Sequence, residues 1–539
     1  MTPPRVMPLV RVAKRWAHWI PSIAVAGIFL LGFLGRPEDH PWLNETPLWA
    51  RGDPFFESSD LLIASPTTIW RGTPNSEATS EFRWAGIENH WRHNSLGLRD
   101  DELISPKPAG TLRVLNLGDS ATWGLNLRDR SETYSDQLEV LLRRSAGAPD
   151  LPIEIRGFDV VNGGTIGFSS LQGARYLERD LERIDPDVVT IYLGNNDPGV
   201  SRMRDSARVG TRLSGISRVM SGNVFYLLVR KAYYSLIRGS AVEEREGLEG
   251  LVSAEVRSEA IGSKERYYEM LARVPPDEYA QNLRAMVDLV RSTGRRVLLL
   301  KVPMNLVWPP PIARPTPRVN MQSWQHWSAV QTERGYLGAA YAGRPPGRRP
   351  LAGHPYLSLM TPEQTGDFLG ASAGPLMETF EAQARGPIGS PERIRALHNL
   401  GVWSLIHGDM AGARARLDQA AAELSRCRPC PDAISTAMTD YMRGIVALLQ
   451  GEDEEAFAHL FESREIWPFA MSPDYEREFD RVVEQMEVEW IDLPRIFSQH
   501  DPAFRGSRLI HDWVHPNAAG NRLIAEAIAD RVLAGSPPN

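Results

Sequence analysis

An apolar strand that ends directly in a serine turn constrains this chain more than any other feature. Residues 113–124 read RVLNLGDSATWG, and a helical pattern follows from about Ser131. A buried strand followed by a helix predicts an α/β unit, and a serine on the connecting turn projects into the crevice where open α/β sheets bind ligands. Because a serine hydroxyl alone is a weak nucleophile, Ser120 needs a base and oxyanion donors from elsewhere in the chain. The alternative is that Asp119 and Ser120 are ordinary helix-capping residues.

A second candidate pair lies just before the last helical pattern, which we expect over residues 518–533. Asp512 and His515 are three residues apart in the stretch DWVHPN. On one turn, both side chains can face the same crevice, where the carboxylate orients the imidazole and the imidazole accepts the serine proton. The alternative is a capping aspartate beside a surface histidine. The neighbouring His511 would have to point away from the crevice.

Two more strand ends offer hydrogen-bond donors for an oxyanion. Residues 160–169 read VVNGGTIGFS, a strand end followed by a turn whose glycines let the backbone approach a ligand and present an amide N–H. Residues 188–193 form a buried strand that ends in Gly-Asn-Asn-Asp, where an asparagine amide can reach the same site. Each of these segments alone is ordinary turn chemistry.

Taken together and in this order, the four segments resemble the four sequence blocks of the SGNH (GDSL-type) hydrolase family. The resemblance implies a flavodoxin-like three-layer α/β/α fold and serine esterase chemistry. It implies Ser120 as nucleophile, His515 as base and Asp512 as the residue that orients the base. It also implies an oxyanion hole made by the N–H of Ser120, the N–H of Gly167 and the side-chain amide of Asn196.

The resemblance covers about residues 94–197, 279–303 and 488–533, a little under half of the chain. Ala121 stands where the family name expects leucine, at a position that varies within the family. Residues 94–100, NSLGLRD, also look like a lead-in seen in bacterial envelope members. The sequence holds no His-Glu-x-x-His zinc motif and no Walker-type phosphate loop. Serine esterase chemistry requires no metal and no organic cofactor, and we expect neither.

The amino terminus predicts a membrane anchor. Residues 16–35 are apolar apart from His18 and Ser22, and a stretch of this length spans a bilayer as a helix. Four basic residues precede it, which predicts that this end stays cytoplasmic. A small-x-small cleavage site is missing, so we favour an uncleaved anchor over a cleaved signal peptide. The expected location is the inner membrane, with one span and a periplasmic catalytic domain.

The length of 539 residues predicts more than one domain, and a net charge of −7 gives no reason to expect a nucleic-acid partner. We expect a mainly α-helical insertion within the hydrolase domain. The expected organisation is a basic segment at 1–15, the anchor at 16–35, a tether at 36–90, the hydrolase domain at 91–303, the loop-rich and helical insertion at 304–485, and the rest of the hydrolase domain at 486–535.

Small residues in the insertion recur with the spacing of tetratricopeptide units. The first set contains Gly401 and Ala413, and the second contains Gly444 and Ala456. Small residues let two antiparallel helices pack closely, but two such units cannot bury their faces alone. They must dock on the catalytic domain, on the helices around 363–385 or on a protein partner. A helical hairpin that merely covers the core is the alternative to a protein-binding role.

Cys427 and Cys430 are the only cysteines, in a single Cys-x-x-Cys. Without a second pair or histidines at ligand spacing, a zinc site is not expected. We expect a local disulfide that closes a loop between two helical patterns.

These observations predict a membrane-anchored, extracytoplasmic serine esterase that cleaves O-acyl esters, on cell-envelope carbohydrate, through an acyl-enzyme. One alternative is an O-acyltransferase, in which a sugar hydroxyl replaces water. Another is a non-catalytic scaffold that binds partners through its helical repeats. The complete set of candidate catalytic residues argues against the scaffold.

Overall fold

A computed structural model describes residues 61–65, 67–82, 87–145, 155–199, 204–208, 264–270, 272–306, 373–406, 409–426, 433–464, 471–502 and 505–535. The predicted anchor at 16–35, most of the predicted tether, and Cys427 and Cys430 lie outside these residues.

In the part of the chain that the structure describes, no helix combines the length and the apolar character needed to cross a bilayer. This finding leaves the predicted single-pass inner-membrane location, with its periplasmic catalytic domain, without support, and we correct that prediction. It relied on the apolar run at 16–35, which lies outside the described residues. Apolar composition alone does not establish that a segment folds as a membrane helix.

Five parallel strands form the central sheet, in the order β6-β5-β7-β8-β9. Numbered along the chain this is 2-1-3-4-5, the flavodoxin-like order. The predicted α/β fold is therefore confirmed in its central sheet, and the arrangement fits an SGNH-type hydrolase. The strands are β5 (Thr111–Gly118), β6 (Gly157–Gly164), β7 (Val188–Tyr192), β8 (Arg296–Lys301) and β9 (Glu489–Asp492).

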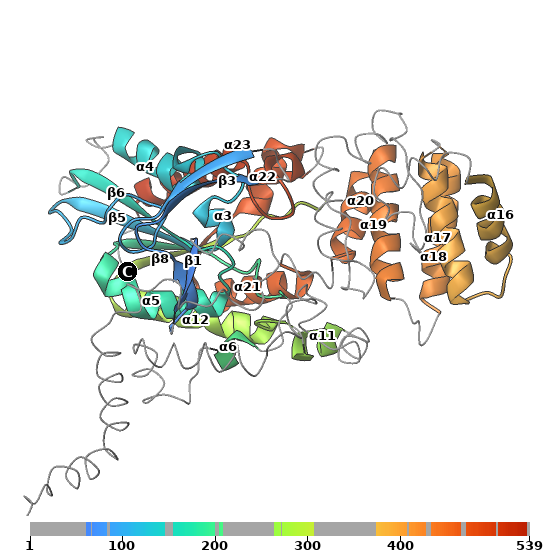
Figure 1. Cartoon of the computed structure of the whole chain (residues 1–539), viewed down its shortest axis with the longest axis horizontal. Helices are drawn as coiled ribbons and strands as arrows, with labels where there is room; N and C mark the ends of the chain where they lie inside the picture. Colours follow the sequence, from blue (N-terminus) through green and yellow to red (C-terminus); the bar gives the residue numbers. More distant parts are fainter. Residues whose placement is uncertain are drawn as a thin grey trace, which may run out of the picture. The chain divides into compact units, whose positions relative to one another are not determined.

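Helices cover both faces of this sheet, which makes three layers (Figure 1). The inner strands consist largely of apolar residues that are almost fully buried, because helices exclude water from both faces of a parallel sheet. One layer contains α4 (Tyr134–Arg144), α22 (Leu493–His500) and α23 (Ala518–Leu533). The other contains α5 (Ser170–Ile184), α12 (Pro276–Ser292) and α21 (Pro473–Met486).

The register of the sheet places the predicted site segments at one edge. Gly118 at the end of β5 lies opposite Gly164 of β6 and Tyr192 of β7. The turns that follow these three strands therefore leave the sheet at the same level. This is the edge at which a doubly wound sheet binds its ligands.

The remaining elements are short or belong to separate sheets. β3 (Glu77–Phe82) and β4 (Ile87–Arg92) pair as an antiparallel ribbon. The chain divides into two compact units, and the smaller one includes β1 (Leu62–Ser65) and most of β2 (Ile69–Gly72), which pair with each other. The short helices are α3 (Ser120–Trp123), η3 (Arg130–Glu132), α6 (Asp205–Arg208), α11 (Lys264–Met270) and η6 (Ser507–Leu509).

The helical insertion contains two hairpins that pack in the same way. A Cβ added to Gly401 would lie 2.7 Å from Cγ of Leu417, and one added to Gly444 would lie 2.7 Å from Cγ of Leu460. Glycine at these positions therefore lets the helices approach closely, which explains why small residues recur at this spacing. Assignment to the tetratricopeptide class stays a prediction. The helices are α16 (Ala373–Ala384), α17 (Pro391–Ile406), α18 (Met410–Leu424), α19 (Ala433–Gln450) and α20 (Asp453–Glu462).

The insertion contacts the loop that carries two of the predicted site residues. Nη2 of the buried Arg464, just after α20, donates to the carbonyl oxygens of Asn305 at 3.2 Å and Leu306 at 3.1 Å. The N–H of Asn305 in turn donates to the carbonyl oxygen of Trp513 at 2.9 Å. Trp513 follows Asp512 directly, so the first residues of the insertion support the loop of Asp512 and His515.

Candidate active site

Ser120 is the first residue of α3, at the end of β5. Asp119 caps this helix, because its Oδ1 accepts the N–H of Ala121 at 2.8 Å. The tight turn requires glycine at its start: a Cβ on Gly118 would lie 1.8 Å from Oγ1 of Thr122. The other end of α3 is closed by Gly124 in the left-handed region, at φ 92°. The local sequence thus holds Ser120 at the edge of the sheet.

The structure brings Ser120, His515 and Asp512 together. Oγ of Ser120 lies 2.7 Å from Nε2 of His515, although the two residues are 395 positions apart in the chain. Nδ1 of His515 lies 2.6 Å from Oδ2 of Asp512. All three residues are buried. This arrangement lets the imidazole accept the serine proton while the carboxylate holds the ring in one tautomer.

The electrostatics of the Asp512–His515 pair favour transfer of a proton to the imidazole. Burial raises the pKa of Asp512, but the charge of His515, its ring hydrogen bond and two backbone N–H groups together bring it below its ordinary value. Those N–H groups belong to Val514 and His515 and lie 3.0 Å from Oδ1. Burial lowers the pKa of His515, but the charge and hydrogen bond of Asp512 bring it above 6.5. An ionised carboxylate therefore stands beside an imidazole that binds a proton readily.

The predicted decoy, His511, takes no part in either side-chain contact of this trio. Its backbone N–H donates to the carbonyl oxygen of His515 at 2.8 Å, across the loop. Burial lowers the pKa of the His511 imidazole. Of the two neighbouring histidines, it is His515 that contacts Ser120.

The two predicted oxyanion segments are tied to each other and to the serine turn. Nδ2 of Asn196 donates to the carbonyl oxygen of Phe168 at 3.1 Å and makes a longer contact, 3.4 Å, with Oδ2 of Asp119. Phe168 follows Gly167, which lies in the left-handed region at φ 75° between β6 and α5. A capping box of Ser169 and Gln172 starts α5 directly after this turn.

Arg273 is a residue of this region that the sequence analysis missed. Its Nη1 donates to the carbonyl oxygen of Gly167 at 2.8 Å, and its Nη2 donates to Oε1 of Gln172 at 2.6 Å. An ion pair with Asp205, at 2.7 Å, neutralises the buried guanidinium. Asp205 also accepts the hydroxyl of Ser169 at 2.8 Å. No motif or spacing in the sequence marks Arg273, which lies 106 residues from Gly167.

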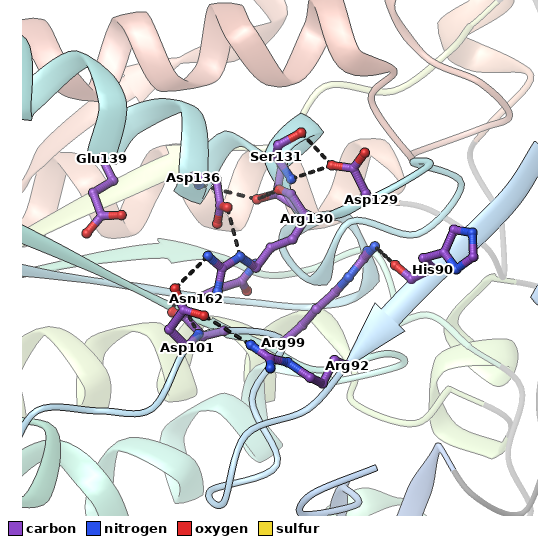
Figure 2. A network of polar contacts seen from close by, with 12 residues as sticks. His90, Arg92, Arg99, Asp101, Asp129, Arg130, Ser131, Asp136, Glu139 and Asn162 are labelled. Atoms are coloured by element: carbon purple, nitrogen blue, oxygen red, sulfur yellow. Dashed lines mark hydrogen bonds and ion pairs between the residues drawn. The ribbon is translucent and has the colours of Figure 1, made fainter. Parts of the chain in front are cut away.

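Arg99, in the lead-in at 94–100, stabilises the turn that carries Ser120. Nη1 of the buried Arg99 donates to the carbonyl oxygens of Trp123 at 3.2 Å and Gly124 at 2.8 Å, where α3 ends. Its guanidinium carbon lies 4.3 Å from the centre of the Trp123 ring, a cation–π contact. Nη2 of Arg99 donates to the carbonyl oxygen of His90 at 2.9 Å, as Figure 2 shows.

Arg130 connects the same lead-in to β6 and α4 (Figure 2). Its guanidinium pairs with Asp100 at 3.2 Å, Asp101 at 2.8 Å and Asp136 at 2.8 Å. Asp100 also accepts the N–H of Asn162 at 2.7 Å. Burial raises the pKa of Asp100 to about 7. These contacts fix residues 94–101 to β6 and to α4. None of them involves Ser120, His515 or Asp512.

Among the described residues, no group of three or more His, Cys, Asp or Glu side chains could hold a metal ion. The trio of Ser120, His515 and Asp512 supplies a hydroxyl, an imidazole and a carboxylate in a hydrogen-bonded row. The chemistry that such a row can perform is nucleophilic attack by the hydroxyl with proton transfer to the ring.

Comparisons with known proteins give remote structural likenesses only. No family model and no curated protein matches the sequence. A catalytic mutant of Axe2, an acetylxylan esterase from Geobacillus stearothermophilus, matches with a TM-score of 0.30 and 12% identity over 80% of this chain and 97% of that one. LAE5, an alpha/beta hydrolase from the metagenome of Lake Arreo, matches with a TM-score of 0.28 and 12% identity over 79% and 97%.

TesA matches with a TM-score of 0.19 and 20% identity, over 37% of this chain and 64% of that one. Axe2 and LAE5 are named as an acetylxylan esterase and an alpha/beta hydrolase. Their TM-scores are too low to support an inference about chemistry. The features that bear on function are the sheet topology and the geometry of Ser120, His515 and Asp512.

Replacing Asn196 with alanine is expected to lower kcat on the order of a hundredfold. The variant loses a donor predicted for the oxyanion, and such a donor contributes roughly 3 kcal/mol to the barrier. Steady-state kinetics on an aryl ester measure the effect. Asn282→Ala is a suitable control, because that amide contacts Oγ of Ser170 at 2.9 Å and no residue of the trio. Wild-type turnover in Asn196→Ala would remove Asn196 from the oxyanion site.

Proposed function

We propose that this protein is a serine esterase that hydrolyses O-acyl esters through an acyl-enzyme. The hydrogen-bonded row of Ser120, His515 and Asp512 at the edge of a doubly wound parallel sheet is the observation that supports this function. A hydroxyl, a base and an orienting carboxylate in this order form the arrangement that recurs in serine hydrolases on unrelated folds.

In the proposed first step, Oγ of Ser120 attacks the carbonyl carbon of the ester as Nε2 of His515 takes the hydroxyl proton. Asp512 stabilises the imidazolium that forms. Collapse of the tetrahedral intermediate breaks the bond to the alcohol, which leaves with the proton from His515. A water molecule then attacks the acyl-enzyme, giving one proton to His515. That proton returns to Oγ of Ser120 as the acid is released.

The negative oxygen of each tetrahedral intermediate is stabilised, in this proposal, by the N–H groups of Ser120 and Gly167 and by Nδ2 of Asn196. Asn196 supports this role through its shorter bond to Phe168, which orients the amide beside the glycine turn. Its 3.4 Å contact with Asp119 is the weaker of the two, so an oxyanion can compete for that hydrogen. Arg273 keeps the Gly167 carbonyl turned into the protein.

We propose carbohydrate O-acyl groups as the substrate class, on the resemblance of the four sequence blocks to the SGNH hydrolases. Acetate release from acetylated glycans, compared with hydrolysis of short- and long-chain aryl esters, tests this choice. Faster turnover of acetylated glycans than of aryl acetates supports it. Activity confined to long-chain esters would point to lipid substrates.

A fluorophosphonate probe tests the nucleophile without assuming a substrate. We expect stoichiometric labelling of the wild-type protein at Ser120, located by mass spectrometry of the labelled peptide. Ser131→Ala is the matched control, because Ser131 is exposed and, among the described residues, its side chain is hydrogen-bonded to Asp129. Failure of the folded wild-type protein to react with the probe would favour the non-catalytic scaffold.

Activity is expected to fall as the pH drops, with a midpoint above 6.5. Only the neutral imidazole of His515 can accept the serine proton, and the Asp512 carboxylate raises the pKa of that ring above its ordinary value. The acid limb of kcat/KM against pH for the free enzyme reports this pKa. A midpoint well below 6.5 would contradict His515 as a base paired with an ionised Asp512.

A further inference from the structure

Asn126 makes a direct contact with the trio that the proposed mechanism does not use. Its Nδ2 lies 2.9 Å from Oδ2 of Asp512, the same oxygen that receives Nδ1 of His515 at 2.6 Å. Two backbone N–H groups occupy the other oxygen, Oδ1. Among the described residues the carboxylate therefore accepts four hydrogen bonds, and the one from Asn126 is the one that comes from outside the loop 512–515.

Asn126 belongs to the segment that carries Ser120. The carbonyl oxygen of Ser120 accepts the N–H of Gly124 at 3.0 Å and the N–H of Leu125 at 2.9 Å, which closes the turn just before Asn126. The side-chain amide of Asn126 is thus held on the same turn as Ser120. The carboxylate that accepts its hydrogen bond lies 386 residues away, on the loop of His515. The contact links the two halves of the trio directly.

The environment of Asn126 indicates that this position needs a side chain that donates a hydrogen bond to Asp512. Its backbone has φ 66°, in the left-handed region that asparagine tolerates and most side chains do not. The residue is buried, and its Oδ1 finds no hydrogen-bond partner among the described residues. A buried acceptor without a partner costs free energy. The hydrogen bond that Nδ2 of Asn126 donates to the Asp512 carboxylate offsets that cost.

We propose that Asn126 is a positioning residue for ester hydrolysis, which fixes the Asp512 carboxylate so that Oδ2 faces the His515 ring. The inference rests on the proposed function of the trio. The second donor on Oδ2 prevents the carboxylate from rotating away as the imidazole gains and loses its proton. It also ties the base to the segment of the nucleophile, which keeps Oγ of Ser120 and Nε2 of His515 within hydrogen-bond distance.

Two variants separate the hydrogen bond from the shape of the side chain. Asn126→Gly keeps the left-handed backbone and removes the amide. We expect kcat to fall roughly tenfold with KM within about twofold, because the trio loses alignment rather than substrate contacts. Asn126→Asp keeps the shape and replaces the donor with a carboxylate. Asn75→Gly is the matched control, since Asn75 is an exposed asparagine with φ 53° that does not contact the trio.

The aspartate variant also predicts a change in pH dependence. The groups that already act on this pair are Asp119, whose negative charge raises the pKa of His515, and His511 and Tyr192, which interact with the pair electrostatically. Two buried carboxyl groups at this distance repel each other when both are ionised, so one of them keeps its proton to a higher pH. Ionisation of that second group adds a negative charge that stabilises the imidazolium of His515, and we therefore expect the acid limb of kcat/KM to move to higher pH in Asn126→Asp.

A measurement that needs no turnover distinguishes failure of this inference from failure of the esterase proposal. NMR titration of the His515 ring in the Ser120→Ala background, assigned with His515→Gln, gives its pKa with and without Asn126→Asp. We expect the His515 pKa to rise in Asn126→Asp. An unchanged His515 titration, together with Asn126→Gly kcat within twofold of the Asn75→Gly control, would overturn the role of Asn126. A shifted titration in a protein that hydrolyses no ester would uphold the contact and reject the esterase.

Discussion

Ester hydrolysis is expected to fall to the background rate when Ser120 is replaced by alanine. The reaction proposed here forms its covalent intermediate on Oγ of Ser120, which among the described residues is the hydroxyl that contacts Nε2 of His515, at 2.7 Å. In a well-characterised serine protease, loss of the nucleophile lowers kcat on the order of a million-fold. Initial rates on an activated aryl ester, measured at high enzyme concentration, give the upper limit of the residual activity of Ser120→Ala.

The variant is expected to fold normally, so the loss reports chemistry rather than unfolding. Alanine has high helix propensity, and Asp119 still caps α3 through its contact with Ala121. An unchanged melting temperature is the control for the fold. A Ser120→Ala protein with substantial esterase activity and no contaminating enzyme would place the nucleophile elsewhere and contradict the proposed mechanism.

Replacing Asp512 with asparagine is expected to lower kcat by roughly four orders of magnitude. An amide cannot stabilise the imidazolium, and it favours the wrong tautomer of His515 because its nitrogen donates where the carboxylate accepts. The His515 pKa should fall as well, since the carboxylate that raises it is gone. The acid limb of the remaining activity is therefore expected at lower pH than in the wild type.

Asp492→Asn provides the matched control for this change. Asp492 caps α22, where its Oδ1 accepts the N–H of Arg495 at 3.0 Å, and it has no contact with the trio. An asparagine can keep that cap, so kcat and the pH profile should stay close to the wild type. Similar losses in both variants would indicate a general loss of stability, and an active Asp512→Asn would contradict the proposed role of Asp512.

The candidate site was largely predictable from the sequence because its chemistry lies on short local segments. Ser120 follows a buried strand across a glycine, and Asp512 and His515 share one turn, so residue order alone points to their chemistry. The predicted oxyanion segment around Gly167 carries a similar local signature, a glycine-rich turn after a strand. Strand patterns that alternate with helical patterns likewise predicted the α/β class, because apolar runs and amphipathic patterns are local properties.

The supporting residues could not be predicted, since each acts across a large sequence separation. Arg273 reaches Gly167, and Asn126 reaches Asp512, through contacts that no spacing rule describes. The predicted membrane location failed for a different reason: it depended on the length, apolar composition and flanking charges of residues 16–35, and no described helix is long and apolar enough to cross a bilayer. Hydropathy counts side chains without testing how they pack.

By itself, the sequence determined which residues can supply a hydroxyl, a base and a carboxylate, and that each follows a strand or opens a helix. Only the tertiary structure decided that these groups meet, because the 2.7 Å contact between Ser120 and His515 depends on how the folded chain brings the turn after β5 against the loop before α23. The packing of buried partners such as Asn126 and Arg273 is likewise a property of the folded chain. Their hydrogen bonds form only once folding has brought together residues that lie 386 and 106 positions apart.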